Sequence, residues 1–236
     1  MEGRTRSGGA EGRPPSRPAV LGQDHLALLG EAGVVHGWSR GEVLMRRGEP
    51  GDRAILLQQG LVKITTEAVN GYTSLLAFRG PGELVGELAV LDGGNRSATV
   101  TAVRPVRGVI IAAARFAVLL QEHGDLALAV LRGVSGRLRH SDGHREALGS
   151  RSAGVRIAHV LLEFAERHGT PASDWAPAAL AVPMTQQELA GAAGTSRESV
   201  VRTLRDLHDL GIVGTARGII VVLDPARLNS WNPDCG

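Results

Sequence analysis

The chain has 236 residues, a formal net charge of +2 at pH 7 and one cysteine, Cys235. One cysteine excludes a disulfide framework, a cysteine-based zinc site and a four-cysteine iron–sulfur cluster. The weak net charge excludes binding of nucleic acid through bulk basicity, so such affinity needs a local arrangement. The length suits two small domains. No apolar run approaches the roughly 18 residues that span a bilayer, and no signal segment is found, so we expect a cytoplasmic protein with no membrane partner.

The first half of the chain reads as a tail followed by a β domain. Residues 1–20 are rich in Gly, Pro, Arg and Ser and are predicted to be a disordered tail, for which solvation is favoured over contact with DNA phosphates. Over 21–114, short β-rich pieces separated by glycine and proline predict a small barrel or roll, and Asn70-Gly71 predicts a hairpin turn. The strands are expected at 42–46, 54–58, 61–66, 73–78, 97–103 and 109–111.

A long helix is predicted over 115–142, where small and apolar residues follow a 3-4-3-4 spacing. This spacing gives a narrow apolar stripe, here called the seam, along one side of the helix. A stripe this narrow favours pairing of two such helices in a homodimer over packing on the β domain. Residues 143–150 are interpreted as a hinge, and 153–168 as a second helix. The seam residues are Ala117, Leu120, Gly124, Ala127, Leu131, Val134, Leu138 and Ser141.

The segment from Gly86 to Thr99, GELAVLDGGNRSAT, has the composition of an anion site. Arg96 offers a planar fork of donors that can grip two phosphate oxygens, Ser97 adds a hydroxyl and Ala98 a backbone N–H. Glu87 cannot bind a phosphate and is suited to accept a hydrogen bond from a sugar hydroxyl. A phosphate site beside a sugar site predicts a nucleotide pocket.

The segment TQQELAGAAGTSRESVVRTLRDL has the signals of a helix-turn-helix. Thr185 and Glu188 form a capping box that opens the first helix, Gly194 supplies the turn, and Ser196 caps the second helix. At 100° per residue, one side of the second helix is apolar and predicted to be buried. The residues of that side are Val200, Leu204 and Leu207.

The opposite side of the second helix is expected to contact DNA. Arg197, Glu198 and Arg202 are placed to read G·C pairs in the major groove, because arginine matches guanine and glutamate accepts from cytosine. Three hydroxyl residues better suit phosphate contacts, namely Thr195, Ser196 and Ser199. Residues 211–223 are predicted to form a hairpin wing, within a reader domain at 151–225 that a tail at 226–236 follows. The expected DNA-binding set is Thr185, Thr195, Ser196, Arg197, Glu198, Ser199, Arg202 and Arg205.

With GELA, RSAT and SRESVVR in this order, the chain from about 25 to 223 resembles the cyclic AMP receptor protein / fumarate–nitrate reductase regulator (Crp/Fnr) family of bacterial transcription factors. The resemblance implies an α+β fold with a cyclic-nucleotide-binding β-roll, a dimerisation helix and a winged helix-turn-helix. It also implies a homodimer on GTGA-type half-sites of double-stranded DNA, controlled by cyclic AMP or another cyclic nucleotide, with RNA polymerase as a partner.

The resemblance assigns Glu87 to the ribose 2′-hydroxyl and Arg96 with Ser97 to the cyclic phosphate. It places Ser141 and Asp142 at the adenine, where the family carries a Thr-Ser pair; Asp142 departs from this pattern and leaves the identity of the base open. The expected ligand-binding set is Gly86, Glu87, Leu88, Ala89, Arg96, Ser97, Ala98, Ser141 and Asp142.

Three other interpretations stay open. The first is the same DNA-binding dimer with a vestigial pocket, which the carboxylate of Asp142 favours. The second is haem ligation by one of the histidines at 123, 140 and 144. The third is a cupin-like metalloenzyme, although the predicted strands from Glu42 to Ile111 contain no histidine. The preferred interpretation is not an enzyme and needs no metal.

Overall fold

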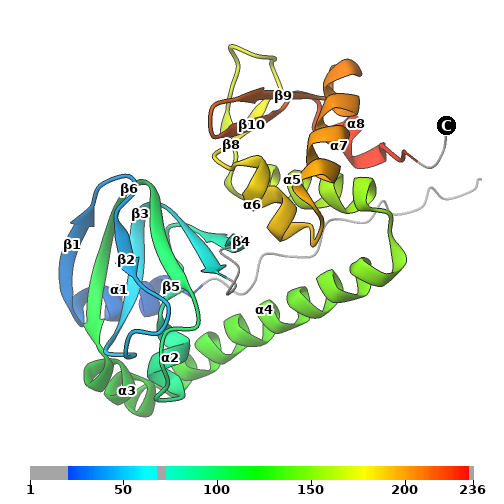
Figure 1. The fold of residues 1–236 in the computed structure, drawn as a ribbon. Coiled ribbons are helices and arrows are strands. Elements are labelled where there is room, and N and C mark those ends of the chain that lie inside the picture. The colour runs from blue at the N-terminus through cyan, green and yellow to red at the C-terminus, as the bar shows by residue number, and fades with distance from the viewer. Residues whose placement is uncertain (1–20, 68–72, 234–236) are drawn as a thin grey trace, which may run out of the picture.

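The computed structural model describes residues 21–67 and 73–233, so the predicted tail at 1–20, the Asn70-Gly71 turn and Cys235 lie outside the described residues. The chain forms a sheet domain, a long helix that runs from the base of this domain to the reader domain, and the reader domain of helices with a small sheet (Figure 1). The expected α+β class, with a roll, a long helix and a winged helix-turn-helix, is confirmed.

The sheet domain is a six-stranded antiparallel roll. Strand β6 lies between β1 and β3, and β3 lies between β6 and β4, while β2 adds to β6 and β5 adds to β3. Buried apolar side chains from these strands fill the roll. The elements are α1 (Gln23–Glu31), β1 (Val34–Trp38), β2 (Val43–Met45), β3 (Arg53–Glu67), β4 (Thr73–Arg79), β5 (Leu84–Val85), α2 (Glu87–Leu91) and β6 (Thr99–Ala112).

The two long strands β3 and β6 were each expected as two short ones. The register between them shifts around Gly60, which has a φ of 90° and at which an added Cβ would lie 2.2 Å from the Pro105 carbonyl oxygen. A positive-φ glycine facing a proline interrupts the ladder locally and bends the strands without ending them. Gly60 and Pro105, which indicate strand ends in the sequence, therefore mark a bend within continuous strands.

The single helix predicted over 115–142 is two helices, α3 (Ala113–Glu122) and α4 (Gly124–Ser150), separated at His123. The break places the first two seam residues on α3 and the others on α4. Residues 143–150, expected to be a hinge, are instead the end of α4. Exposed glycines in a helix cost only about 1 kcal/mol each, which propagation from a long helix offsets.

The reader domain has its apolar core between helices and a four-stranded sheet in the order β7-β8-β10-β9. The helix predicted over 153–168 is confirmed as α5, and the predicted wing is confirmed as the hairpin of β9 and β10. The short elements β7, β8 and α8 were not predicted. The elements are α5 (Ala153–His168), β7 (Thr170–Pro171), β8 (Leu180–Val182), α6 (Gln186–Ala192), α7 (Arg197–Asp209), β9 (Val213–Ala216), β10 (Ile219–Val222) and α8 (Pro225–Ser230).

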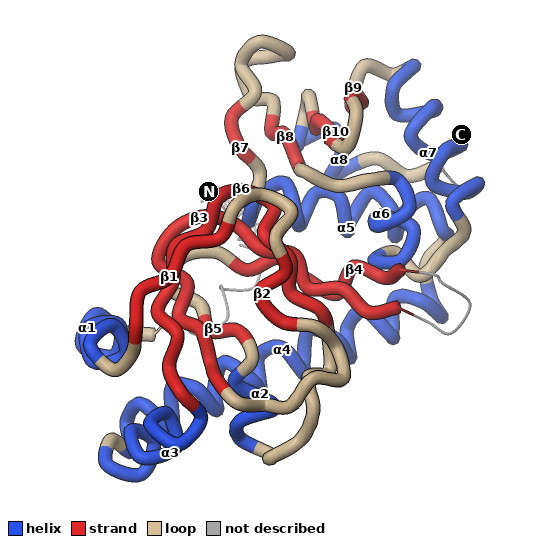
Figure 2. The backbone as a smooth tube through the Cα atoms, turned by 60° about the vertical axis from the view of Figure 1, so that its left-hand side comes forward, coloured by secondary structure: helices blue, strands red, loops and turns tan. Residues whose placement is uncertain are grey.

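The reader domain docks on the sheet domain where α6 meets β4 (Figure 2). One apolar cluster contains buried residues of both domains, and in it the ring of Phe78 on β4 meets Phe164 on α5 edge-on, with centroids 5.2 Å apart. An added Cβ at Gly191 would lie 2.8 Å from the Cα of Ser74, so the backbones of α6 and β4 are in direct contact. The first helix of the helix-turn-helix is thus held against the roll.

Candidate nucleotide pocket and DNA-reading surface

A glycine turn opens the predicted nucleotide segment. Gly86 follows β5 and precedes α2 with a φ of 79°, a conformation that side chains disfavour. An added Cβ there would lie 2.5 Å from Met45 Cε and 2.6 Å from Arg96 Nη1. Glycine is therefore required for its backbone conformation and for space, and the turn rests directly on the Arg96 guanidinium.

The Arg96 side chain is buried and hydrogen-bonded to the protein; the residue is 4% exposed. Its Nη1 donates to the Gly86 carbonyl at 2.7 Å, and its Nη2 donates to Asp52 Oδ1 at 2.9 Å and to the Arg53 carbonyl at 2.7 Å. These bonds use three of the five guanidinium N–H groups, so at most two remain for a phosphate. Sequence reasoning missed the partner Asp52, because nothing local marks a contact across 44 residues.

Glu87, the predicted sugar ligand, is also buried and forms an ion pair with Arg137 of α4. A buried carboxylate is stable only when a cation or donors compensate its charge. In the sequence, only this requirement indicates that a cation lies beside Glu87. It cannot identify Arg137, which lies 50 residues away and outside the seam. Arg79 lies nearby, and burial lowers its pKa although the Glu83 carboxylate opposes the change.

The other predicted ligand residues differ in exposure. Ala89 and Ala98 are buried beside the Gly86 turn and Arg96, whereas Leu88 and Ser97 are exposed. The structure therefore places a buried Arg96 against the turn that precedes the buried Glu87, but leaves the Ser97 side chain on the surface.

The predicted base contacts lie on α4. Ser141 and Asp142 both have exposed side chains. Ser141 is four residues after Arg137, so the two lie one above the other on the same face of the helix. The helix that supplies the partner of Glu87 thus also carries the residue expected at the base.

The helix caps of the predicted helix-turn-helix are confirmed. The Thr185 hydroxyl accepts from the Glu188 N–H at 3.2 Å, and Glu188 Oε2 accepts from the Thr185 N–H at 2.8 Å, which completes the capping box of α6. The Ser196 hydroxyl caps α7 by accepting from the Ser199 N–H at 3.2 Å. These bonds fix where both helices begin.

The turn between α6 and α7 contacts the end of α4. Gly194 has a φ of 57°, and an added Cβ there would lie 2.4 Å from Leu148 Cδ2. Arg156 of α5 donates from Nε to the Ala193 carbonyl at 3.1 Å and from Nη2 to the Gly194 carbonyl at 3.2 Å. A change in the direction of α4 would therefore act directly on the helix-turn-helix.

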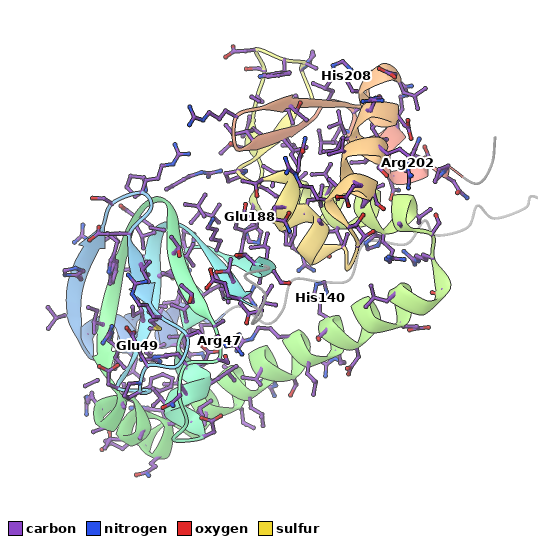
Figure 3. The ribbon with its side chains drawn as sticks, viewed as in Figure 1. Arg47, Glu49, His140, Glu188, Arg202 and His208 are labelled. Atoms are coloured by element: carbon purple, nitrogen blue, oxygen red, sulfur yellow. The ribbon has the colours of Figure 1, made fainter. Side chains whose placement is uncertain are left out.

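Helix α7 has one buried and one exposed side, as expected. Figure 3 shows Arg202 on the outer side of α7, away from the sheet domain. Glu198 accepts hydrogen bonds from its own backbone N–H and from the Ser196 hydroxyl, and these bonds lower its pKa. It therefore stays an ionised acceptor beside the arginines. The buried residues are Val200, Thr203, Leu204 and Leu207, and the exposed ones include Arg197, Glu198, Val201, Arg202 and Arg205.

A groove of about 440 Å³ separates the wing from α6 and the start of α7. Helix starts, hydroxyls, amides and an arginine meet in it, which suits a phosphate backbone. Its polar lining includes Thr185, Gln186, Gln187, Arg197 and Thr215.

Within 21–67 and 73–233 no helix is both long and apolar enough to cross a membrane. In the same ranges no cluster of three or more His, Cys, Asp or Glu side chains is arranged to hold a metal ion.

Comparisons with known proteins match both halves of the chain. The model of the cyclic nucleotide-binding domain matches residues 35–123, and that of the Crp-like helix-turn-helix domain matches 155–231. The chain is 30% identical over 189 residues to a CRP-like cAMP-activated global transcriptional regulator of Mycobacterium tuberculosis. The aligned residues make up 80% of this chain and 84% of the relative. This chain belongs to the Crp/Fnr family of transcription regulators.

This Crp/Fnr regulator is also similar to other regulators of the family. It is 27% identical to a global nitrogen regulator of Synechocystis over 83% of this chain and 87% of the relative. It is also similar in fold to a CRP/FNR family transcriptional regulator of Thermus thermophilus, with a TM-score of 0.69, 24% identity, and coverage of 84% and 99% of the two chains. The relatives are transcription regulators, and the matched domains imply binding of a cyclic nucleotide and of DNA.

Proposed function

We propose that this Crp/Fnr regulator is a homodimer that binds two-fold DNA sites with GTGA-type half-sites, and that cyclic AMP controls its affinity for them. RNA polymerase is the proposed partner at promoters, and the cytoplasm the proposed compartment. The observation that carries the proposal is the pair of buried, oppositely charged groups at one turn, Arg96 beside Gly86 and Glu87 next to it.

The pocket chemistry supports a cyclic nucleotide. The phosphate would take the remaining guanidinium donors of Arg96, and the ribose hydroxyl would donate to Glu87. Both side chains are already buried, so binding loses little side-chain entropy. The name of the Mycobacterium relative, which is cAMP-activated, favours cyclic AMP over other cyclic nucleotides.

The contacts of α4 offer a route from ligand to DNA. A ribose hydroxyl on Glu87 would compete with Arg137 for the carboxylate and so loosen or reset α4 against the roll. The far end of α4 reaches the helix-turn-helix through Leu148 and Gly194. A ligand that favours one position of α4 therefore favours one position of the reader domain.

The exposed side of α4 supports dimerisation. Leu131 and Leu138 are 59% and 60% exposed, whereas Leu126 and Val130 of the same helix are buried against the sheet domain. Two large exposed apolar residues seven positions apart suit a helix pair. Two copies paired there would present two α7 helices to successive major grooves, about 34 Å apart.

Calorimetry of the full chain tests the ligand. Cyclic AMP titrated with and without duplex DNA carrying GTGA half-sites should bind in both cases, and DNA should tighten binding by about 1–3 kcal/mol because coupling is reciprocal. Arg96→Leu should abolish the heat, whereas Arg107→Leu, at an exposed arginine of β6, should not. Absence of heat from the wild-type protein in both titrations overturns the cyclic AMP assignment.

A second candidate is the same DNA-binding dimer with a vestigial pocket. It is favoured by the three internal hydrogen bonds of Arg96 and by Asp142 where the family carries a Thr-Ser pair. A gel shift at fixed salt separates the two candidates. Equal affinity for DNA with and without cyclic nucleotide favours the vestigial pocket.

A further inference from the structure

Val201 is an apolar residue on the polar face of α7. It is 38% exposed, while the neighbouring Val200 is completely buried. Of the residues one turn away from it, Arg197, Glu198 and Arg205 are exposed and Leu204 is buried. Val201 thus stands among the side chains that the proposed function places against base edges.

The fold does not account for a valine at this position. Val201 belongs neither to the buried residues of the reader-domain core nor to the apolar residues packed against that core. Valine also favours helix less than alanine, leucine, lysine or glutamate, because its branched side chain loses rotamer freedom. Neither core packing nor helix propensity therefore favours valine at this exposed position.

Resting on the proposed DNA binding, we propose that Val201 reads the C5-methyl group of a thymine in the major groove. Thymine is the only DNA base that presents a methyl group there, and apolar side chains recognise it by contact. Arg197 and Glu198 select G·C pairs by hydrogen bonds, and Val201 selects a T·A pair next to them. The half-site is then specified by two kinds of contact from one face of α7, namely hydrogen bonds to G·C pairs and an apolar contact with a thymine methyl group.

Deoxyuridine provides the test, because it differs from thymidine only by lacking the C5-methyl group. Duplexes are first selected from a randomised pool with the full chain, with and without cyclic AMP, at fixed salt. In the selected duplex each thymine of the half-site is then replaced, one at a time, by deoxyuridine. At one position the wild-type protein should lose about fourfold in affinity per half-site, the value of one buried methyl group.

Val201→Ala removes the methyl groups that make the contact and favours the helix, so the variant should fold. It should bind the thymine and deoxyuridine duplexes equally. Val118→Ala is the matched control, since Val118 is also helical and 38% exposed but lies on α3; it should keep the wild-type preference. As a gain-of-contact test, cytosine at the same position should bind more tightly when it is 5-methylated, and only to proteins that keep Val201.

Two results overturn the assignment while leaving the proposed function intact. The first is a selected site at which no thymine responds to deoxyuridine. The second is an equal response from the wild-type protein and Val201→Ala, which would place the methyl contact on another residue. If the full chain binds no duplex above the level of random DNA, the proposed function itself fails and the Val201 assignment fails with it.

Discussion

Lys63 Nζ lies 2.5 Å from Glu188 Oε1, and this ion pair joins β3 of the roll to the first helix of the helix-turn-helix. Glu188 is 7% exposed, and Figure 3 shows it at the junction of the two domains. Its two oxygens have separate tasks, because Oε2 completes the capping box with Thr185 while Oε1 binds Lys63. Lys63 is the only lysine of the chain.

Lys63→Met should loosen the docking of α6 without removing its cap. The variant leaves one oxygen of a buried carboxylate without its donor, which costs about 1–3 kcal/mol. Amide hydrogen exchange in α6 should therefore accelerate by roughly 5- to 150-fold if exchange follows undocking. Lys63→Arg, which keeps the cation, serves as control. Equal exchange in Lys63→Met and wild-type protein would contradict a docking role for the pair.

The same pair should weaken in acid. Burial alone raises the pKa of Glu188, but hydrogen bonds from Lys63 and Thr185 outweigh burial and place the pKa below its ordinary value of 4.5. A lowered pKa in the folded state means that the stabilisation is present above pH 4.5 and is lost as the pH falls through the lowered value. The exchange difference between wild-type protein and Lys63→Met should shrink over that range. A difference that stays constant as the pH falls through that range would show that Glu188 is not the titrating group.

Gly86→Ala should disrupt the proposed nucleotide site. The added Cβ meets Met45 Cε and Arg96 Nη1 within 2.6 Å, and alanine is disfavoured at a φ of 79°. We expect loss of cyclic nucleotide binding and a fall in the free energy of unfolding of about 1–3 kcal/mol. Gly93→Ala is the control, since Gly93 has a φ of 68° but nothing within 4 Å of its added Cβ. Calorimetry and thermal unfolding should separate them, and equal nucleotide affinity in both variants would contradict the steric argument.

The elements that the sequence predicted well are those set by nearby residues. The caps at Thr185 and Ser196 and the turn at Gly194 lie within twelve positions, and each uses only local backbone groups. The bend of β3 was read as a strand end because the facing residue, Pro105, comes from a distant strand. Local patterns carry no information about such pairings.

The sequence indicates which residues form the candidate nucleotide site, but not the side chains with which those residues form ion pairs. The residues Glu87 and Arg96 stand out by chemistry within one short segment. Their partners lie far along the chain, with Arg137 separated from Glu87 by 50 positions and Asp52 from Arg96 by 44. Arg137 on α4 meets Glu87 because the break at His123 sets the direction in which α4 leaves α3. No periodicity in the sequence encodes that direction.

Arg137→Met should destabilise the sheet domain through Glu87. The substitution leaves a carboxylate buried without its cation, which costs about 2–4 kcal/mol for a partly exposed pair. Arg139→Met, at an exposed arginine of the same helix, should cost little. Adding Glu87→Gln to Arg137→Met should recover part of the loss, because the buried charge is then gone. Additive losses measured by urea unfolding would contradict a direct pairing.

Leu138→Glu should dissociate the proposed homodimer. Leu138 is 60% exposed on the face of α4 that also carries Leu131, so pairing of two chains would bury both leucines. A glutamate there places two like charges in an apolar seam, and the desolvation of each should weaken association by more than 100-fold. Sedimentation equilibrium should give twice the chain mass for the wild-type protein and the chain mass for the variant.

Leu210→Glu is the matched control for this experiment. Leu210 is also a largely exposed leucine, at 48%, but it follows α7 in the reader domain, away from α4. The control should keep the wild-type mass, because a charge at an already solvated position changes no interface. If Leu138→Glu keeps the wild-type mass as well, the two chains meet elsewhere and the seam residues of α4 are not the contact. A wild-type protein that sediments at the chain mass would instead remove the dimer, and the two α7 helices would no longer be held at the spacing of successive major grooves.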